Sequence, residues 1–178
     1  MIEMTIESIR VSLRNYQRVV ILREKGADRF LPIWIGPPEA DAIAVRLQEV
    51  SVARPLTHDL LCNLITEFGG IVKSVVVNDL ENDTFFARIH IEQDGRMIEI
   101  DSRPSDAIAI AVRTKVPIYA EESVLDRAGV VLNDEGEPVE GAEERPAGVT
   151  PEELEKLSAF SEFIDQLDLD DLGEAGKS

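Results

Sequence analysis

The sequence contains little cysteine or histidine and no long apolar run. Its one cysteine, Cys62, lies within an apolar helical pattern, so a disulfide framework is excluded and a reducing compartment is expected. With two histidines in the chain, Cys62 is expected to be a buried free thiol rather than a nucleophile. No run of about 18 apolar residues occurs, and no basic start precedes one, so neither a membrane span nor a signal peptide is expected. These absences predict a soluble cytoplasmic protein.

Several sequence motifs that specify a reaction are also missing. Phosphate-loop, zinc-cluster, dinucleotide-binding and Gly-x-Ser-x-Gly patterns do not occur. There is no run rich in Lys and Arg, and the net charge is −17. Residues 1–128 hold 15 Lys and Arg against 20 Asp and Glu, a net −5, whereas residues 129–178 hold 3 against 15, a net −12. This balance argues against strong nucleic-acid binding.

What the sequence does have is 44% apolar residues in clear periodic patterns. Alternation predicts an antiparallel meander of three strands, with a bulge near Glu7 and Ser8 in the first. Two helices follow, and the apolar residues of the second are expected to face inward: Leu60, Leu61, Leu64, Ile65 and Phe68. The predicted strands are 1–13, 18–24, 30–35, 71–77, 84–92, 96–101 and 117–120, and the predicted helical segments are 39–50, 57–68, 104–113 and 121–127.

The composition changes past Gly129, which divides the chain into a domain and an appendage. We predict a domain at 1–130, an acidic disordered linker at 131–149, an amphipathic helix at 150–170 and a disordered tail at 171–178. The helix opens with a capping box, Thr150 to Glu153, that has Pro151 at the first helical position. A single free helix of this length is marginal in water, so it is expected to dock on the body, a neighbouring subunit or another partner.

The segment 98–113 contains the most informative polar residues. It reads as a strand that passes through the junction segment, residues 101–106, into an apolar helix. Pro104 suits the first helical turn, Ser102 can cap the free amides, and Asp106 suits the positive end of the helix dipole. Helix capping accounts for these residues, and the alternative is a site for an anion or a metal-bridged phosphate.

Two other helix starts carry candidate residues. His58 and Asp59 follow Thr57, the predicted cap of the second helix, and could act as acid and base or ligate a metal. Glu39 and Asp41 lie in the first turn of the helix after Gly36, but at this spacing they point apart. Complementarity to the helix dipole is the simpler explanation of all three carboxylates.

Four segments, in this order, resemble the bifunctional nuclease domain family over about residues 1–130. They read LPIWIG (31–36) with EA (39–40), RPLTHDL (54–60), SRPSDAIA (102–109) and VPIY (116–119). The acidic linker and closing helix resemble the tail of actinobacterial members. The resemblance implies an α+β domain with a mixed, mostly antiparallel sheet and three main packed helices, together with a tendency to form homodimers. It also implies nuclease activity on DNA and RNA, which is ascribed chiefly to plant members.

No catalytic assignment comes with this resemblance, so we infer roles from the motif positions. The expected reaction is metal-assisted phosphodiester hydrolysis with Mg²⁺ or Mn²⁺. The predicted metal ligands are Glu39, Asp59, Asp101 and Asp106. Asp59 and Asp106 are thereby also part of the predicted catalytic set.

The remaining predicted roles concern proton transfer and phosphate binding. His58 is expected to act as general base or acid, and Arg103 to stabilise developing negative charge as a bidentate donor. Ser102 and Ser105 are expected to hydrogen-bond phosphate oxygens. Because the chain is acidic, binding of nucleic acid should be weak and strongly salt-dependent.

Two alternatives of other classes stay open. In the first, the protein is a non-catalytic homo-oligomeric binding or regulatory module, and the junction segment is a structural cap network. In the second, the acidic tail mimics nucleic acid and shields a basic groove.

Overall fold

The computed structural model describes residues 1–11 and 17–131. The amphipathic helix and disordered tail that were predicted, and all but the first residue of the predicted linker, lie outside the described residues. The described part contains eight strands and four helices. The elements are β1 (Ile2–Val11), β2 (Arg18–Glu24), β3 (Arg29–Ile35), α1 (Pro37–Leu47), α2 (Thr57–Glu67), β4 (Ile71–Glu81), β5 (Thr84–Gln93), β6 (Arg96–Ser102), α3 (Pro104–Thr114), β7 (Ile118–Ala120), α4 (Glu122–Ala128) and β8 (Val130–Val131).

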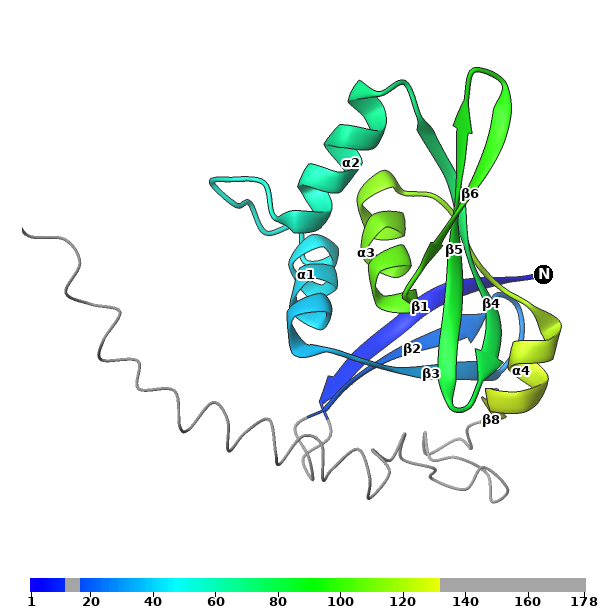
Figure 1. Cartoon of the computed structure of the whole chain (residues 1–178). Helices are drawn as coiled ribbons and strands as arrows, with labels where there is room; N and C mark the ends of the chain where they lie inside the picture. Colours follow the sequence, from blue (N-terminus) through cyan, green and yellow to red (C-terminus); the bar gives the residue numbers. More distant parts are fainter. Residues whose placement is uncertain (12–16, 132–178) are drawn as a thin grey trace, which may run out of the picture. The chain divides into compact units, whose positions relative to one another are not determined.

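All eight strands form one sheet in the order β6-β5-β4-β7-β1-β2-β3-β8 (Figure 1). The predicted β1-β2-β3 meander is confirmed, and its register shifts between Ile6 and Ser8, where the bulge was predicted. Strand β7 pairs parallel with β4 and antiparallel with β1, and it thereby joins two antiparallel meanders. Every other pair is antiparallel, so the fold is α+β with a mixed, mostly antiparallel sheet, as expected.

The second meander, β4-β5-β6, continues directly into α3. Its β5–β6 turn contains Asp94 and Gly95, both with positive φ, which matches the twist of a tight antiparallel hairpin. In β6, Ile98 pairs with Ile91 and Ile100 pairs with Ile89. All four side chains lie on the face of the sheet that is turned toward the core, to which Ile89 belongs. Because side chains alternate along a strand, Asp101 points to the opposite face.

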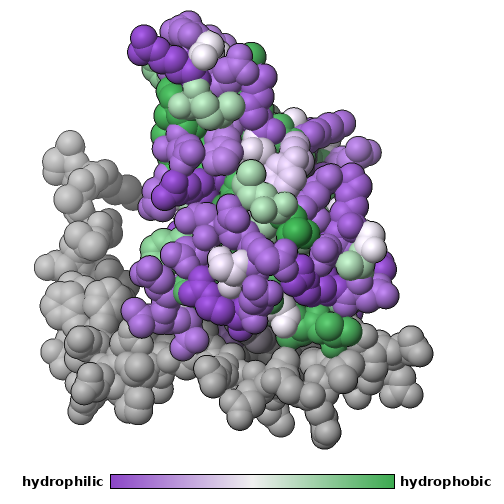
Figure 2. All heavy atoms as spheres, turned by 90° about the vertical axis from the view of Figure 1, so that its right-hand side faces the viewer, coloured by the Kyte–Doolittle hydropathy of each residue, from purple (hydrophilic) through white to green (hydrophobic). Residues whose placement is uncertain are grey.

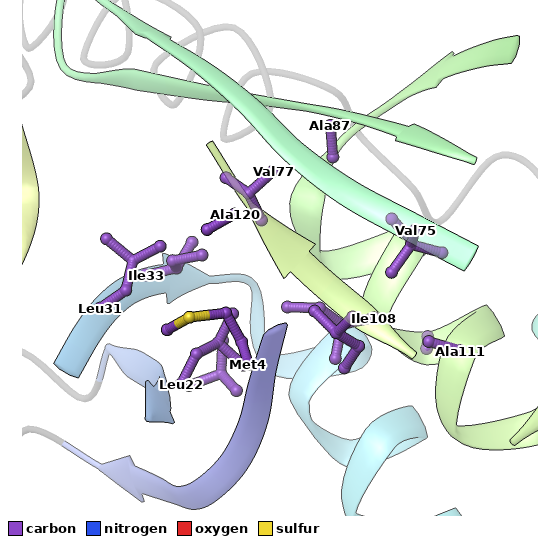
Figure 3. Packing of buried hydrophobic residues seen from close by; sticks show 14 of the residues in the cluster. Met4, Leu22, Leu31, Ile33, Val75, Val77, Ala87, Ile108, Ala111 and Ala120 are labelled. Atoms are coloured by element: carbon purple, nitrogen blue, oxygen red, sulfur yellow. The ribbon is translucent and has the colours of Figure 1, made fainter. Parts of the chain in front are cut away.

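Helix α3 is the centre of the core. It packs against α1, α2, β4 and β5, and seven of its residues are buried. Its alanines let neighbouring elements approach closely, while Ile108 fills the space between the two meanders beside Met4 and Val75 (Figure 3). Burying this helix is therefore what holds the halves of the sheet to one hydrophobic core.

The prediction that the apolar residues of α2 face inward is wrong for four of the five. Leu60, Leu61, Leu64 and Phe68 are exposed, Phe68 to 74%, and Ile65 alone packs partly against the core. The side of α2 that meets the body instead carries His58, Cys62 and Ile65. Helical periodicity identified the apolar stripe correctly, but periodicity does not say which element covers it.

Candidate functional site

Three helices begin with the same arrangement of charge. Glu39, Asp59 and Asp106 are each the third residue of their helix, α1, α2 and α3. A carboxylate there lies beside free backbone N–H groups and the positive end of the helix dipole. Asp59 shows this directly, because its Oδ2 accepts a hydrogen bond from the Leu56 N–H at 2.8 Å.

The residues that begin these helices differ from the predicted caps. The N-cap of α2 is Leu56, and Thr57 is already helical. The N-cap of α3 is Arg103. The side chain of neither N-cap residue accepts a hydrogen bond from the backbone of its helix. Ser102 is one residue too early to cap, and its hydroxyl donates to the Arg103 carbonyl at 3.1 Å.

Arg103 links two of the three carboxylates. Its Nε donates to Asp106 Oδ2 at 2.7 Å, and its Nη2 donates to Glu39 Oε1 at 2.8 Å. The hydrogen bond to Asp106 is the main reason that the pKa of Arg103 is raised. The guanidinium joins the starts of α1 and α3 while its side chain stays 67% exposed. Arg103 is therefore a cation that an anion in solution can reach.

His58 binds the other oxygen of Asp106. The imidazole Nε2 lies 2.9 Å from Asp106 Oδ1, and His58 is 8% exposed. Among the described residues, the Nδ1 of His58 has no hydrogen-bond partner. Burial alone raises the pKa of Asp106, but the hydrogen bonds from Arg103 and His58 outweigh it, and the pKa lies below its usual value. A carboxylate thus joins a buried imidazole to an exposed guanidinium.

Arg113, near the end of α3, completes this group of side chains, although no sequence motif pointed to it. It is 5% exposed. Its Nε donates to Asp59 Oδ1 at 2.7 Å, Nη2 to the Ala42 carbonyl at 3.1 Å and Nη1 to the Ala109 carbonyl at 2.9 Å. One buried guanidinium therefore connects α1, α2 and α3. A single cation in the last turn of a helix that is apolar from Ala107 to Val112 was the sequence signal that could have identified it.

Three of the predicted site residues do not join the group. Asp101 projects from the opposite face of the sheet and lines a hollow of about 200 Å³ with Asn78, Asp79, Glu81, Phe86 and Arg88. Ser105 is buried at 6% exposure, and Ser102 donates to backbone. We call the residues that do come together, Glu39, His58, Arg103 and Asp106, the His58–Arg103 cluster, with Asp59 and Arg113 beside it.

Most of the carboxylate oxygens of Glu39, Asp59 and Asp106, which were predicted to bind Mg²⁺ or Mn²⁺, already accept hydrogen bonds from groups of the protein itself. Both oxygens of Asp106 and both of Asp59 accept hydrogen bonds, and Glu39 binds Arg103. Within residues 1–11 and 17–131, no group of three or more His, Cys, Asp or Glu is placed to hold a metal ion. In this arrangement, the predicted ligands do not fit a divalent cation, which would have to displace Arg103 first.

Comparison with known proteins places the chain in a family. The bifunctional nuclease domain matches residues 20–133, which include every residue of the His58–Arg103 cluster. The chain belongs to the bifunctional nuclease domain family. The family resemblance of the four sequence segments is thereby confirmed. In the part of the chain that the structure describes, no helix is long and apolar enough to cross a membrane.

Relatives of two kinds are found. An uncharacterized protein of Mycobacterium tuberculosis is 44% identical over 169 residues, which cover 95% of this chain and 96% of the relative. Bifunctional nuclease 2 of Oryza sativa subsp. japonica is 32% identical over 118 residues, 64% of this chain and 36% of the plant protein. Bifunctional nuclease 2 of Arabidopsis thaliana is 29% identical over 131 residues, 70% of this chain and 40% of that protein. The matched segments thus cover less than half of each plant protein.

Proposed function

We propose that the protein hydrolyses phosphodiester bonds of nucleic acids at the His58–Arg103 cluster. The observation that carries the proposal is that the carboxylate of Asp106 binds both a buried imidazole and an exposed guanidinium. Membership of a nuclease family supports the choice of substrate class, since the named plant relatives are bifunctional nucleases. A histidine for proton transfer and an arginine for a phosphate oxyanion are the groups that this reaction uses.

Arg103 is the residue that meets the substrate. Its planar guanidinium can bind two phosphate oxygens, and binding them would replace its bonds to Glu39 and Asp106. Most of its side chain is already in solvent, so this exchange needs no movement of the backbone. In the transition state, Arg103 would stabilise the charge that develops on the phosphate oxygens.

His58 is the residue that moves the proton. The Asp106 carboxylate accepts a hydrogen bond from Nε2 of His58, which fixes the orientation of the ring. Nδ1 is then left to take a proton from the attacking water or to give one to the leaving oxygen. Water attacks phosphorus, the bond to the leaving oxygen breaks, and the leaving oxygen ends with a proton. Asp59 and Arg113 are positioning residues, because they hold the start of α2 against α1 and α3.

A need for Mg²⁺ or Mn²⁺ stays a prediction for the assay to test, because the predicted ligands do not fit a divalent cation while Arg103 binds Glu39 and Asp106. The roles proposed for Arg103 and His58 are the same with or without the ion. The acidity of residues 1–128 also predicts weak binding that falls steeply as salt increases, because few cations offset the repulsion of a polyanion.

The test is a nuclease assay of the purified full chain on single-stranded DNA and RNA. We expect Asp106→Asn and Arg103→Met each to lower kcat/KM by about 100-fold, as when one oxyanion donor is removed from an active site. Asp79→Asn is the matched control, because Asp79 also binds an arginine, Arg127, but lies outside the His58–Arg103 cluster. Each variant is measured after chelation and after addition of Mg²⁺ or Mn²⁺.

The outcomes separate the site from contamination. Loss in the cluster variants with full activity in Asp79→Asn supports the proposal. Activity that survives both metal removal and Asp106→Asn would belong to another site or to a contaminating enzyme.

The exposed apolar residues of α2 favour a second candidate, a non-catalytic homo-oligomeric binding or regulatory module. In that case, Asp106→Asn lowers the melting temperature, and the wild-type chain shows no turnover under any condition. The two candidates differ in whether the cluster variants lose a measurable activity or only stability.

A further inference from the structure

Glu39 occupies the part of Arg103 that a phosphate needs. A guanidinium binds an anion bidentately along one of two edges, Nε with Nη2 or Nη1 with Nη2, so both edges share Nη2. In this structure Nη2 donates to Glu39 Oε1 at 2.8 Å, whereas Nη1 has no hydrogen-bond partner within residues 1–11 and 17–131. An anion that binds along either edge therefore meets the carboxylate of Glu39, either as a rival for the same N–H group or as a like charge beside it.

The start of α1 gives Glu39 little else to bind. Pro37 and Pro38, the first two residues of the helix, have no N–H group, so two of the amides that are usually free at a helix start are missing. Among the described residues, Arg103 is the one hydrogen-bond partner of the Glu39 carboxylate. The side chain of Glu39 is 16% exposed, against 67% for Arg103. The carboxylate is thus held in place, and the guanidinium is the partner that can move away.

Gly36 leaves the space that the Glu39 carboxylate fills. A Cβ atom at Gly36 would overlap Oε2 of Glu39, which is the oxygen that does not bind Arg103. The backbone of Gly36 has φ −65° and ψ 150°, which any residue adopts, so this position uses the missing side chain and not the conformational freedom of glycine. Glycine here lets the carboxylate lie close to the backbone while its other oxygen binds Arg103.

We propose that Glu39 is an internal competitor of the substrate, which occupies Arg103 until a phosphate of the nucleic acid displaces it. The inference rests on the proposed function, because it takes Arg103 as the residue that binds the phosphate. Glu39 and Asp106 place two negative charges on one cation, so the phosphate approaches a guanidinium whose charge is already more than balanced. Removing Glu39 therefore strengthens binding, which the loss of a purely structural residue or of a metal ligand would not do.

The test is the affinity of the full chain for a labelled single-stranded DNA of about 12 nucleotides, measured by fluorescence anisotropy with a chelator present. Glu39→Gln should bind the DNA about 5-fold more tightly, because it releases Arg103 from a partly exposed ion pair. Gly36→Ala keeps the charge of Glu39 but displaces its carboxylate, and it should strengthen binding by about 3-fold. Both gains should shrink as salt is added, since salt screens the repulsion between Glu39 and the phosphate.

A charge-matched control is needed because hydrophilic residues cover most of the side of the molecule that faces right in Figure 1 (Figure 2). Glu99→Gln is that control. Glu99 binds another exposed arginine, Arg88, outside the His58–Arg103 cluster, and its substitution changes the net charge by the same amount. It should alter the affinity by less than about 2-fold. Equal gains in Glu99→Gln and Glu39→Gln would be a general effect of charge and would overturn the role of Glu39.

Arg103→Met separates this inference from the proposed function. If Arg103→Met leaves the affinity unchanged, the phosphate-binding role of Arg103 fails, and the role of Glu39 fails with it. If Arg103→Met weakens binding while neither Glu39→Gln nor Gly36→Ala binds more tightly than the wild type, only the role of Glu39 is overturned. Adding Glu39→Gln to Arg103→Met should give no gain, because no guanidinium is left to release. Circular dichroism shows which variants are folded, and Gly36→Ala decides alone if Glu39→Gln is not.

Discussion

Helices α2 and α3 have the same length and similar apolar content, but only one of them is buried. Each has 11 residues and an aspartate at its third position. Helix α3 buries seven residues under the two meanders, whereas α2 buries only His58. The difference shows that an apolar stripe on a helix does not by itself imply a place in the core.

The candidate site lies where these two helices meet. The buried helix contributes Asp106 and Arg113, with Arg103 at its N-cap, and the exposed helix contributes His58 and Asp59. The buried helix therefore holds the carboxylate and both guanidinium groups, and the imidazole comes from a helix that buries less of its surface. The ion pair between Arg113 and Asp59 and the hydrogen bond between His58 and Asp106 couple the two helices.

The largest expected effect comes from removing core volume in α3. Ile108→Ala should lower the free energy of unfolding by about 2–5 kcal/mol at any protein concentration, because Ile108 is fully buried. Leu64→Ala in α2 should cost less than about 1 kcal/mol at low concentration, where its side chain meets water. Urea denaturation measures both. Equal losses in dilute solution would mean that the two helices are not packed differently.

The next effect separates the two arginines of the site. Arg113→Met should destabilise the fold by about 3 kcal/mol, because it removes the cation that pairs with Asp59 and the hydrogen bonds that this buried guanidinium donates to the Ala42 and Ala109 carbonyls. Arg103→Met should cost at most about 1 kcal/mol, because that side chain is largely in water. Thermal unfolding of both variants checks the prediction. If Arg103→Met proved the more destabilising, Arg103 would be structural and would not be a substrate-binding residue.

A smaller effect is expected in acid. The pKa values of Asp106 and Asp59 lie below the usual 3.8 in the folded protein, so the unfolded chain binds protons more readily. Their contribution to stability is therefore complete above pH 3.8 and is lost as the pH falls through the lower folded values. Asp106→Asn should flatten the acid limb of the stability curve, because it removes one of the two carboxylates that cause it. Urea denaturation of this variant and of the wild-type chain at a series of pH values checks the prediction. An acid limb unchanged by Asp106→Asn would contradict the hydrogen bonds described for Asp106.

The sequence predicted the strands well because each leaves a local signal. Alternation located β2 at its observed bounds, and the change of parity between Ile6 and Ile9 located the bulge. The site was only partly predictable. Helix starts identified Glu39, Asp59 and Asp106, but Asp101 was grouped with them because it is close in sequence, and strand alternation turns it to the other face.

What the sequence could not supply is the long-range pairing of charges. Arg113 and Asp59 are 54 positions apart, and only the packing of α2 on α3 brings them together. The same packing joins His58 to Asp106 and leaves the stripe of α2 outside. Local patterns define elements, and the neighbours of an element follow from the topology of the sheet.

The most direct test of the central claim is a double-mutant cycle on His58 and Asp106. Single-turnover cleavage of single-stranded DNA is measured for the wild-type chain, His58→Gln, Asp106→Asn and the double variant, each shown to be folded. If Asp106 acts by orienting His58, the double variant should be no slower than His58→Gln, because the losses overlap. If the fold-losses in cleavage rate of the two single variants multiply in the double variant, Asp106 does not act through His58. A His58→Gln variant that cleaves at the wild-type rate would also contradict the proposed role of His58.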